Sequence, residues 1–444
     1  MTTHPGAKTA PNPPSSSANS PSSFYGWWIV AAAFVFMMLI VGFALYGLPL
    51  FYPIWVKEFG WRRDQIIIGN TMSKIIIGPI LGFAAGWAIE KYGPKMVMLF
   101  GALCAAAAML GFGMMNSTTA LYGFFFFNAL GYLCAGPLPN QVLLSYWFTR
   151  LRGRVMGIAY VGIGVGGMLV PWVIRYFNGQ FGWRGSVKAL ALLFAVVMLL
   201  ALIVIKRRPA DLGLFPDGDA QPQNKADANA KPIELKRVVR TSAFWLLAAG
   251  SIFSISAIGG VMQNLALYIA DILPKEQVDL TKTTVASLTL GASIAGRIVM
   301  GWLADRYPKK YVMLATYLIV GLSIPLLIAA RDMPSLLYVF AITFGFGLGA
   351  DYMLIPLMAA ECFGLGALSR VLGIIIMSDA VGEATMPTLV ATIRETTGSY
   401  ANGFALITVL ALAGAAAILS IKYRNGVPVS RLQLDAQNTA AIGD

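Results

Sequence analysis

Long apolar stretches separated by short polar connections occupy the chain from residue 27 onward. Each stretch has about 20 residues, the length at which an α-helix crosses a hydrocarbon layer of ~30 Å. The stretches are continuously apolar, whereas a membrane β-barrel would alternate in segments of about ten residues. The pattern predicts twelve membrane-spanning helices, at 27–50, 66–89, 95–115, 119–143, 154–176, 187–205, 243–270, 283–303, 310–330, 335–359, 367–391 and 401–422.

Polar segments divide these spans into two groups of six. Residues 206–242 contain four prolines and eight Lys or Arg, and we expect them to form a cytoplasmic linker between a bundle at 24–205 and a bundle at 243–422. Residues 1–23, rich in Pro, Ser, Ala and Asn, are predicted to be a disordered cytoplasmic tail, and residues 423–444 a second cytoplasmic tail. The predicted fold class is an all-α integral membrane protein with two pseudo-symmetric six-helix bundles.

Composition agrees with a membrane protein and excludes other classes. Hydrophobic residues make up 57% of the chain and charged residues 12%, too few charges for a water-facing surface. The net charge of +13 does not indicate nucleic-acid binding, because the basic residues lie at the ends of apolar segments. The single histidine, His4, lies in the polar tail, and the three cysteines form no paired pattern, so we expect no metal site and no cofactor. A phosphate-binding loop is absent from the sequence, which argues against an ATP-driven pump, and we do not expect an enzyme.

The distribution of Lys and Arg predicts the orientation. If the amino terminus is cytoplasmic, the cytoplasmic segments hold 21 basic residues and the opposite loops hold 10. The excess predicts that both termini are cytoplasmic. The short loops suit a plasma membrane of the bacterial inner-membrane type.

The two halves are related to each other in sequence. The segment GWAIEKYGPK, which begins at Gly86, matches GWLADRYPKK, which begins at Gly301, at an offset of 215 residues. The segment RVMGI at Arg154 matches RVLGI at Arg370, at an offset of 216. A nearly constant offset across separate motifs indicates duplication of a six-helix unit.

These features resemble the major facilitator superfamily of secondary transporters. The loop motif of that family is present as Gly86, Glu90, Lys91, Gly93 and Lys95; a second copy has Gly301, Asp305, Arg306 and Lys310, with Pro308 in place of the second glycine. The stretch YWFTRLRGRVMGIAYVGIGVGG around the fifth span resembles the monocarboxylate porter and oxalate/formate antiporter branches. The resemblance implies alternating access around a central site, with the loop residues acting as gates: Gly86, Glu90, Lys91, Asp305 and Arg306.

Arg297 is the predicted substrate anchor. A charged residue inside the bilayer costs about 2.5–3.5 kcal/mol even on a lenient scale, so it should face a cavity or a partner. A guanidinium matches a carboxylate with two parallel hydrogen bonds. The alternative is a permanent pairing with a structural acid. In animal-type monocarboxylate porters an aspartate tends to precede this arginine by one turn, and here that position is Ser293.

Polar residues on the spans that line the cavity in this superfamily are candidate lining residues. Each of them has the alternative role of bonding a neighbouring helix. They are Tyr46, Asn128, Tyr132, Gln263, Asn264, Tyr268 and Tyr352.

Three acids inside the spans are candidates for proton coupling. Asp351 lies at a depth similar to Arg297 by residue count. Asp379 and Glu383 are four residues apart and share a helix face, where two ionised carboxylates would repel. Lys74 is the available cation, and we expect either an outer gate formed by Lys74 and Glu383 or a static bridge between them.

The predicted function is secondary transport of a small monocarboxylate, such as lactate or pyruvate, coupled to protons. Dicarboxylate exchange and drug efflux are alternatives within transport; a non-transporting membrane sensor and an embedded enzyme are alternatives outside it. The expected partners are a small organic acid, protons and membrane lipid, and the chain is expected to act as a monomer.

Overall fold

The computed structural model describes residues 24–219, 234–424 and 427–434. Within these ranges the side chains of residues 63–64, 67–68, 70–80 and 279 are not described. Almost all of the described chain is helical, and the two short strands pair with each other near the carboxyl end.

The first half contains six spans built from helices α1 to α7. The first span runs through α1 (Gly26–Met37), the π-helical η2 (Met38–Leu45), the 3-10 helix η3 (Leu48–Phe51) and α2 (Tyr52–Phe59). It is followed by α3 (Arg63–Tyr92), α4 (Pro94–Phe112), α5 (Thr118–Ala135), α6 (Pro137–Trp147) and α7 (Arg152–Val204). Gly136 breaks the fourth span into α5 and α6, and Gly182, with φ +66°, divides α7 into two helices.

The linker and the second half follow. The linker contains η4 (Pro209–Leu212), η5 (Pro216–Gly218) and α9 (Leu235–Val238). The second half contains α10 (Ser242–Ile272), α11 (Lys275–Arg306), α12 (Lys309–Ser323), α13 (Pro325–Ala329), α14 (Leu336–Phe363), α15 (Leu368–Thr397) and α16 (Ala401–Leu419), and it ends in the hairpin of β1 (Tyr423–Arg424) and β2 (Val427–Pro428).

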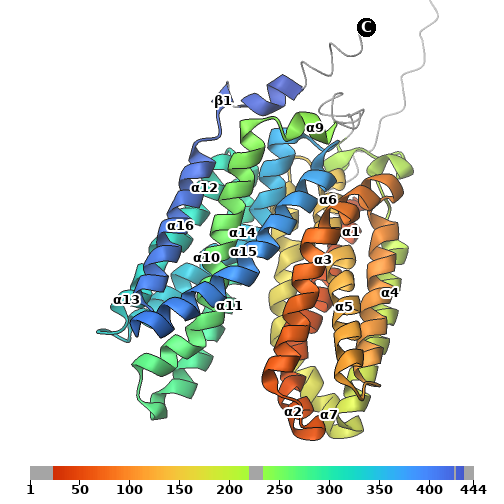
Figure 1. Cartoon of the computed structure of the whole chain (residues 1–444). Coiled ribbons are helices and arrows are strands. Elements are labelled where there is room, and N and C mark those ends of the chain that lie inside the picture. The colour runs from red at the N-terminus through yellow and green to blue at the C-terminus, as the bar shows by residue number, and fades with distance from the viewer. Residues whose placement is uncertain (1–23, 220–233, 425–426, 435–444) are drawn as a thin grey trace, which may run out of the picture.

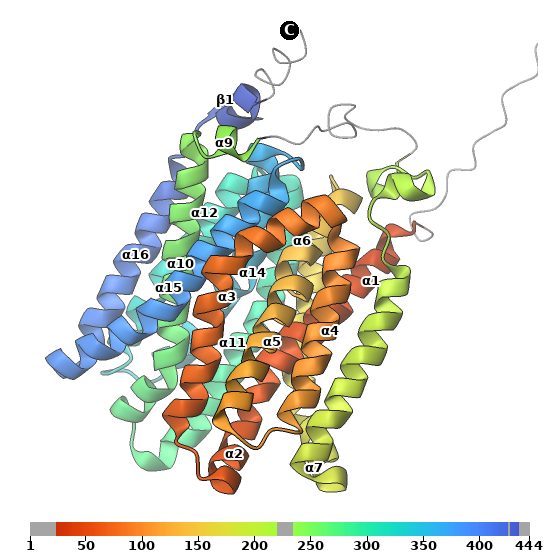
Figure 2. The same cartoon turned by 45° about the vertical axis from the view of Figure 1, so that its right-hand side comes forward.

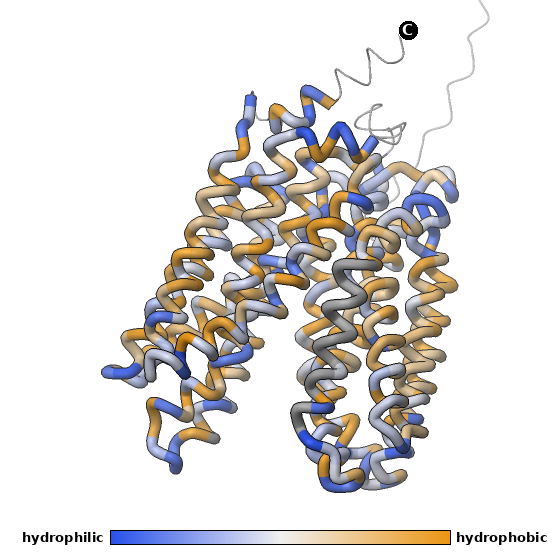
Figure 3. The backbone as a smooth tube through the Cα atoms, in the orientation of Figure 1, coloured by the Kyte–Doolittle hydropathy of each residue, from blue (hydrophilic) through white to orange (hydrophobic). Residues whose placement is uncertain are grey.

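The number of spans agrees with the apolar pattern of the sequence. Ten stretches of the described residues are long and apolar enough to cross a membrane, and one of them is α7 with its two helices. The 30-residue α3 adds a further span. The predicted all-α fold with twelve transmembrane helices is therefore confirmed. Apolar residues cover the helix shafts and polar residues gather at both ends of the molecule (Figure 3).

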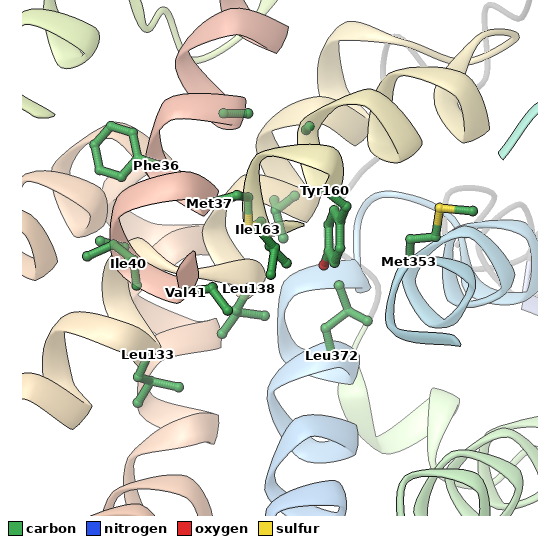
Figure 4. Close-up of a cluster of buried hydrophobic side chains, with 14 of the residues drawn as sticks. Phe36, Met37, Ile40, Val41, Leu133, Leu138, Tyr160, Ile163, Met353 and Leu372 are labelled. Carbon is green, nitrogen blue, oxygen red and sulfur yellow. The ribbon is translucent and has the colours of Figure 1, made fainter. Parts of the chain in front are cut away.

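The six-helix halves form two bundles that contact each other near one end and diverge toward the other (Figure 1). The linker helix α9, the hairpin strand β1 and the start of α1 lie at the end where the bundles meet (Figure 2), and we call this end the terminal face. The bundles are joined mainly by α3 against α15 and by α11 against α7. The buried apolar cluster around Met37, Leu138 and Tyr160 of the first half extends to Met353 and Leu372 of the second (Figure 4).

Candidate functional site at the interface between the bundles

Arg297 lies on α11, nine residues before its end at the terminal face, which corresponds to about 14 Å along the helix axis. Its side chain is buried, with 8% exposed, and Nη1 donates a hydrogen bond to Ser293 Oγ at 2.8 Å. The buried Nε has no hydrogen-bond partner among the described residues. Gly157 of α7 packs on the backbone of Arg297 so closely that a Cβ there would lie 2.5 Å from the carbonyl oxygen. Arg297 therefore lies on the contact between the two bundles.

Tyrosines from the first bundle surround this arginine. Tyr46, at the end of the π-helical segment of the first span, and Tyr160 of α7 both lie within electrostatic range of the guanidinium. Tyr46 also lies within range of Glu383, on α15 of the other bundle, yet 46% of its surface is exposed. Tyr46 is therefore partly exposed and lies near charged groups of the opposite bundle.

Gln141 and Tyr160 join this group, although neither was predicted from the sequence. Gln141 of α6 hydrogen-bonds the hydroxyl of Tyr160 and donates to the backbone oxygen of Tyr352 on α14 at 3.3 Å. The two side chains are almost completely buried. A glutamine beside Asn140 in an otherwise apolar span is the signal that could have identified this link between the bundles.

Glu383 is half-buried on α15 and lies near three phenols, those of Tyr46, Tyr132 and Tyr352. Its backbone packs against Gly259 of α10. The side chain of Lys74, the predicted gate partner of Glu383, lies outside the described residues. Between Tyr132 and Tyr352 there is a hollow of about 10 Å³, close to the least space that one water molecule occupies.

The two aspartates lie deeper inside the second bundle. Asp379 accepts hydrogen bonds of 2.8 Å at both carboxylate oxygens from Ser251, and Asp351 accepts one of 2.7 Å at Oδ1 from Ser254. Both carboxylates are completely buried, and each lies within electrostatic range of Tyr317. Oδ2 of Asp351 has no partner in the described part of the chain. Among the described residues no ion pair joins Asp351 to Arg297, so similar depth did not bring these two residues together.

The remaining candidate lining residues differ in their surroundings. Asn264 is buried and donates to the backbone oxygens of Gly260 and Pro387, at 2.9 and 3.1 Å. Tyr268 is buried and donates to the carbonyl oxygen of Leu327. These two side chains take part in helix packing within the second bundle. Gln263 is exposed and Asn128 is half-buried.

The first copy of the loop motif lies where α3 meets α15. Glu90 forms a bidentate ion pair with Arg370, and both side chains are 23% exposed. Gly86 packs on the start of α15, where a Cβ would lie 2.5 Å from the carbonyl oxygen of Ser369. Lys91 stacks over the ring of Trp87, with Nζ 4.8 Å from the ring centre.

The second copy lies where α11 meets α7. Asp305 accepts backbone hydrogen bonds from Gly153 at 2.6 Å and from Arg154 at 3.0 Å, in the first turn of α7. Its carboxylate is only 5% exposed, and Arg154 Nε lies 3.5 Å away. Arg306 stacks over Trp302, with the guanidinium carbon 4.1 Å from the ring centre. Both copies of the motif therefore contact the opposite bundle at its helix starts.

Sequence comparison agrees with this architecture over most of the chain. The sequence profile described as the Major Facilitator Superfamily matches residues 34–274 and 274–440. The chain belongs to this superfamily. It is thus a multi-pass membrane protein with the fold of these transporters, as the loop motif and the duplicated halves predicted.

Individual members of the superfamily show which proteins this chain is similar to. Monocarboxylate transporter 12 of Rattus norvegicus is 29% identical over 364 residues, 73% of this chain and 74% of the relative. The membrane sensor protein UhpC of Salmonella typhimurium is 25% identical over 404 residues, 85% of this chain and 89% of the relative. Relatives from the superfamily therefore include both transporters and a sensor.

Solved structures of two proton symporters have the same fold. The E. coli fucose:proton symporter FucP superposes with a TM-score of 0.69 at 14% identity, covering 90% of this chain and all of the other. The proton:xylose symporter XylE superposes with a TM-score of 0.70 at 13% identity, covering 94% of this chain and all of the other. At these identities the likeness shows the fold alone.

Proposed function

We propose that this member of the Major Facilitator Superfamily transports a small monocarboxylate, of the lactate or pyruvate type, together with a proton. The observation that carries the proposal is Arg297: a buried cation at the contact between the bundles, with one donor unpartnered and an exposed tyrosine beside it. The similarity to a monocarboxylate transporter over nearly three quarters of both chains supports the same substrate class.

The chemistry of the site favours an anion with a flat carboxylate. A guanidinium presents paired N–H donors that match the two oxygens of a carboxylate, and the pairing is stronger where water is scarce. Nη1 donates to Ser293 Oγ, and the buried Nε has no partner among the described residues, so Nε is left for a ligand. Binding a solute of one negative charge would also neutralise a cation whose burial in a membrane is costly.

The coupling proton is assigned to the acids of the second bundle. Burial of two neighbouring carboxylates disfavours the ionised form of each, which makes them suitable sites for a transported proton. Asp379 and Glu383 lie on one face of α15. This face connects the two buried aspartates to the tyrosines near Arg297. A proton held on this chain of groups would be released or taken up as the anion enters or leaves.

The closed terminal face supports transport by alternating access. The Lys and Arg count supports a cytoplasmic terminal face, and with that orientation the conformation described above is open to the outside. Breaking the contacts of Glu90 and Asp305 would let the bundles rock about the central site and open it to the cytoplasm. On this basis the loop residues act as the inner gate, in a plasma membrane with both termini inside.

Counterflow of labelled lactate in proteoliposomes tests the substrate class. We expect exchange by the wild-type protein, and a loss of at least about 30-fold in Arg297→Gln, because removing one partner of a buried charge pair costs several kcal/mol. Arg175→Gln is the matched control, since Arg175 is an exposed arginine of α7 in the other bundle. Equal exchange by Arg297→Gln and Arg175→Gln would contradict the anchor role.

Proton coupling has a separate readout. Asp379→Asn should retain lactate exchange, which requires no net proton movement, and should lose uptake driven by a pH gradient. Unchanged proton flux in Asp351→Asn, Asp379→Asn and Glu383→Gln would remove these acids from coupling. Exchange of a dicarboxylate in place of lactate would support the alternative substrate class.

A non-transporting sensor is the second candidate, because a protein named as a membrane sensor matches 85% of the chain. A sensor would bind labelled carboxylate to purified protein without counterflow. Saturable binding together with no exchange at any pH gradient would favour this function over transport.

A further inference from the structure

The first part of the linker, residues 206–219, is fastened to helix ends of the first bundle at the terminal face. Trp147, the last residue of α6, donates from Nε1 to the backbone oxygen of Lys206 at 3.0 Å. Arg207 donates to the backbone oxygen of Glu90, near the end of α3, at 3.0 Å. The linker therefore contacts the gate residue Glu90 from within its own bundle.

The carboxylate of Asp217 holds the turn that precedes α7. Its Oδ2 accepts backbone hydrogen bonds from Thr149 at 2.9 Å and from Arg150 at 2.8 Å, and its Oδ1 accepts one from Leu151 at 3.1 Å. Leu151 is the residue directly before the helix. Backbone N–H groups outside regular structure need an acceptor, so a carboxylate that binds three of them in succession fixes the conformation of the turn.

Asp305 binds the next part of the same chain segment from the opposite bundle. Its carboxylate accepts from the amides of Gly153 and Arg154, in the first turn of α7. Two acids thus hold one stretch of backbone, residues 149–154: Asp217 from the linker and Asp305 across the interface. Because an N–H group donates well only in a narrow range of directions, the bonds to Asp305 depend on how the turn before α7 directs the start of the helix.

The backbone of Asp217 itself is in an uncommon conformation. Among the described residues Asp217 is the only one other than glycine with a positive φ, at +60°. This left-handed conformation is costly for a residue with a Cβ, although aspartate tolerates it better than most residues do. A glycine would avoid the cost but would have no carboxylate. The three hydrogen bonds to the turn before α7 account for an aspartate at this position.

We propose that Asp217 is a positioning residue of the inner gate. By holding residues 149–151, it directs the amides of Gly153 and Arg154 toward Asp305 and so stabilises the conformation that is closed at the terminal face. The proposal rests on the proposed function, in which Asp305 is part of that gate. The linker then contributes to the transport cycle through α7, in addition to joining the two bundles.

Maleimide labelling of Ala304→Cys in the full-length protein, without the native cysteines, tests the proposal, since Ala304 is buried where α11 meets α7. We expect labelling to be about fivefold faster in Asp217→Ala, the effect typical of losing an acid that binds amides at a helix start. Asp211→Ala is the matched control. It removes an exposed acid from the same linker, whose bond is to the amide of Arg208 within the linker, and it should leave labelling unchanged.

Double variants distinguish positioning from a general loss of stability. If Asp217 acts through the amides that Asp305 binds, Asp217→Ala should add less than about twofold in the background of Asp305→Ala. In the background of Glu90→Ala, at the other contact, Asp217→Ala should add its full effect of about fivefold, because separate contacts are additive.

Two further variants separate the carboxylate from the backbone conformation. Asp217→Gly accepts a positive φ without cost and has no acceptor, so it should label about as fast as Asp217→Ala. Asp217→Asn keeps one oxygen acceptor and tolerates the same φ, so it should label more slowly than Asp217→Gly.

The outcomes distinguish this proposal from the inner gate on which it rests. Unchanged labelling in Asp305→Ala would refute the gate and the proposal together. Three results would overturn the proposal alone: faster labelling in Asp305→Ala but not in Asp217→Ala, full addition of the two effects in the double variant, or wild-type labelling in Asp217→Gly.

Discussion

The two copies of the loop motif hold the same interface by different bonds. At the α3–α15 contact Glu90 pairs with the guanidinium of Arg370, and both side chains are partly open to water. At the α11–α7 contact Asp305 is nearly buried and accepts two backbone hydrogen bonds at the start of α7. A glutamate is one methylene longer than an aspartate, so the first acid reaches a side chain while the second stays on the backbone.

This difference predicts different strengths for the two contacts. A partly exposed ion pair is worth about 0–1 kcal/mol, somewhat more when bidentate, and it weakens with salt. A buried carboxylate that accepts two N–H bonds at a helix amino terminus gains about 1.5–3 kcal/mol per charged hydrogen bond and also the helix dipole. The contact made by Asp305 should therefore be the stronger part of the closed terminal face.

The connections after the motifs also differ. Gly93 has φ +85°, a conformation that favours glycine, whereas the equivalent Pro308 has φ −53°. The α3–α4 turn consequently makes room for Arg207, which packs against Gly93. Both copies keep the acid, the base and the close glycine, but the turns that follow them differ.

The largest expected effect comes from the close glycines, where the two copies should behave alike. Gly86→Val and Gly301→Val each place a side chain against the backbone of the other bundle, at Ser369 and at Gly153. Because backbone cannot move aside as a side chain can, the strain should exceed the 1–3 kcal/mol typical of overpacking. Both variants should force the terminal face open, measured as maleimide labelling of Ser369→Cys or Ala304→Cys in a background without the native cysteines.

The control for these variants is Gly123→Val, where an added Cβ meets nothing within 4 Å. It should leave the labelling of both reporter cysteines unchanged. If Gly86→Val alone opened the interface, the close packing at the two contacts would not be equivalent.

The second largest effect separates the copies. Asp305→Ala removes both backbone hydrogen bonds and the attraction to Arg154, and it should shift the closed state by about 3 kcal/mol. Glu90→Ala should shift it by about 1 kcal/mol. Labelling of Ala304→Cys and Ser369→Cys should therefore rise at least fivefold more in the first variant, and a larger rise in Glu90→Ala would reverse the proposed ranking.

A charge exchange sharpens the same comparison with a smaller effect. Glu90→Arg/Arg370→Glu should restore the low labelling that either single substitution loses, by about fivefold, because the pair is made by two side chains. Asp305→Arg/Arg154→Asp should not restore it, since an arginine cannot accept the backbone bonds of α7. Added salt should weaken the first contact and leave the second nearly unchanged. Rescue of both pairs would show that charge alone holds the interface.

The sequence predicted this interface better than it predicted the interior. Two motifs at a nearly constant offset were enough to identify Glu90 and Asp305 as equivalent residues at helix ends. The partners of Asp351, Asp379 and Asn264 could not be predicted, because a membrane helix is apolar on its lipid side and on its packed side alike. Hydrophobic periodicity therefore does not show which way each helix is rotated, and the hydrogen bonds from Ser251 and Ser254 depend on that rotation.

The local backbone geometry was equally difficult to predict from the sequence. Tyr268 donates to the carbonyl oxygen of Leu327. Leu327 lies in the last turn of the short helix α13, where the carbonyl oxygens accept no hydrogen bond from within the helix. The apolar run at 310–330 gave no sign of a break between α12 and α13, although Pro325 stands at the point where the second helix begins. The tyrosine was predicted to line a cavity because a helix end inside a span was not foreseen.

The smallest expected effect concerns the bases of the motif, Lys91 and Arg306. Each stacks on a tryptophan four residues earlier on its own helix, and within the described residues neither forms an ion pair with the other bundle. An exposed cation–π contact is worth about 0.5–1 kcal/mol. Lys91→Met and Arg306→Met should therefore each destabilise the end of their helix slightly, which would be measured as a small fall in the melting temperature. Both variants should change the labelling of the reporter cysteines by less than about twofold. Lys91→Arg keeps the cation and should match the wild-type protein in both measurements. The opposite result is that Lys91→Met opens the terminal face as far as Asp305→Ala does. That result would show that the bases act on the interface through their charge. Net charge, and not burial, would then determine which of the two contacts is stronger.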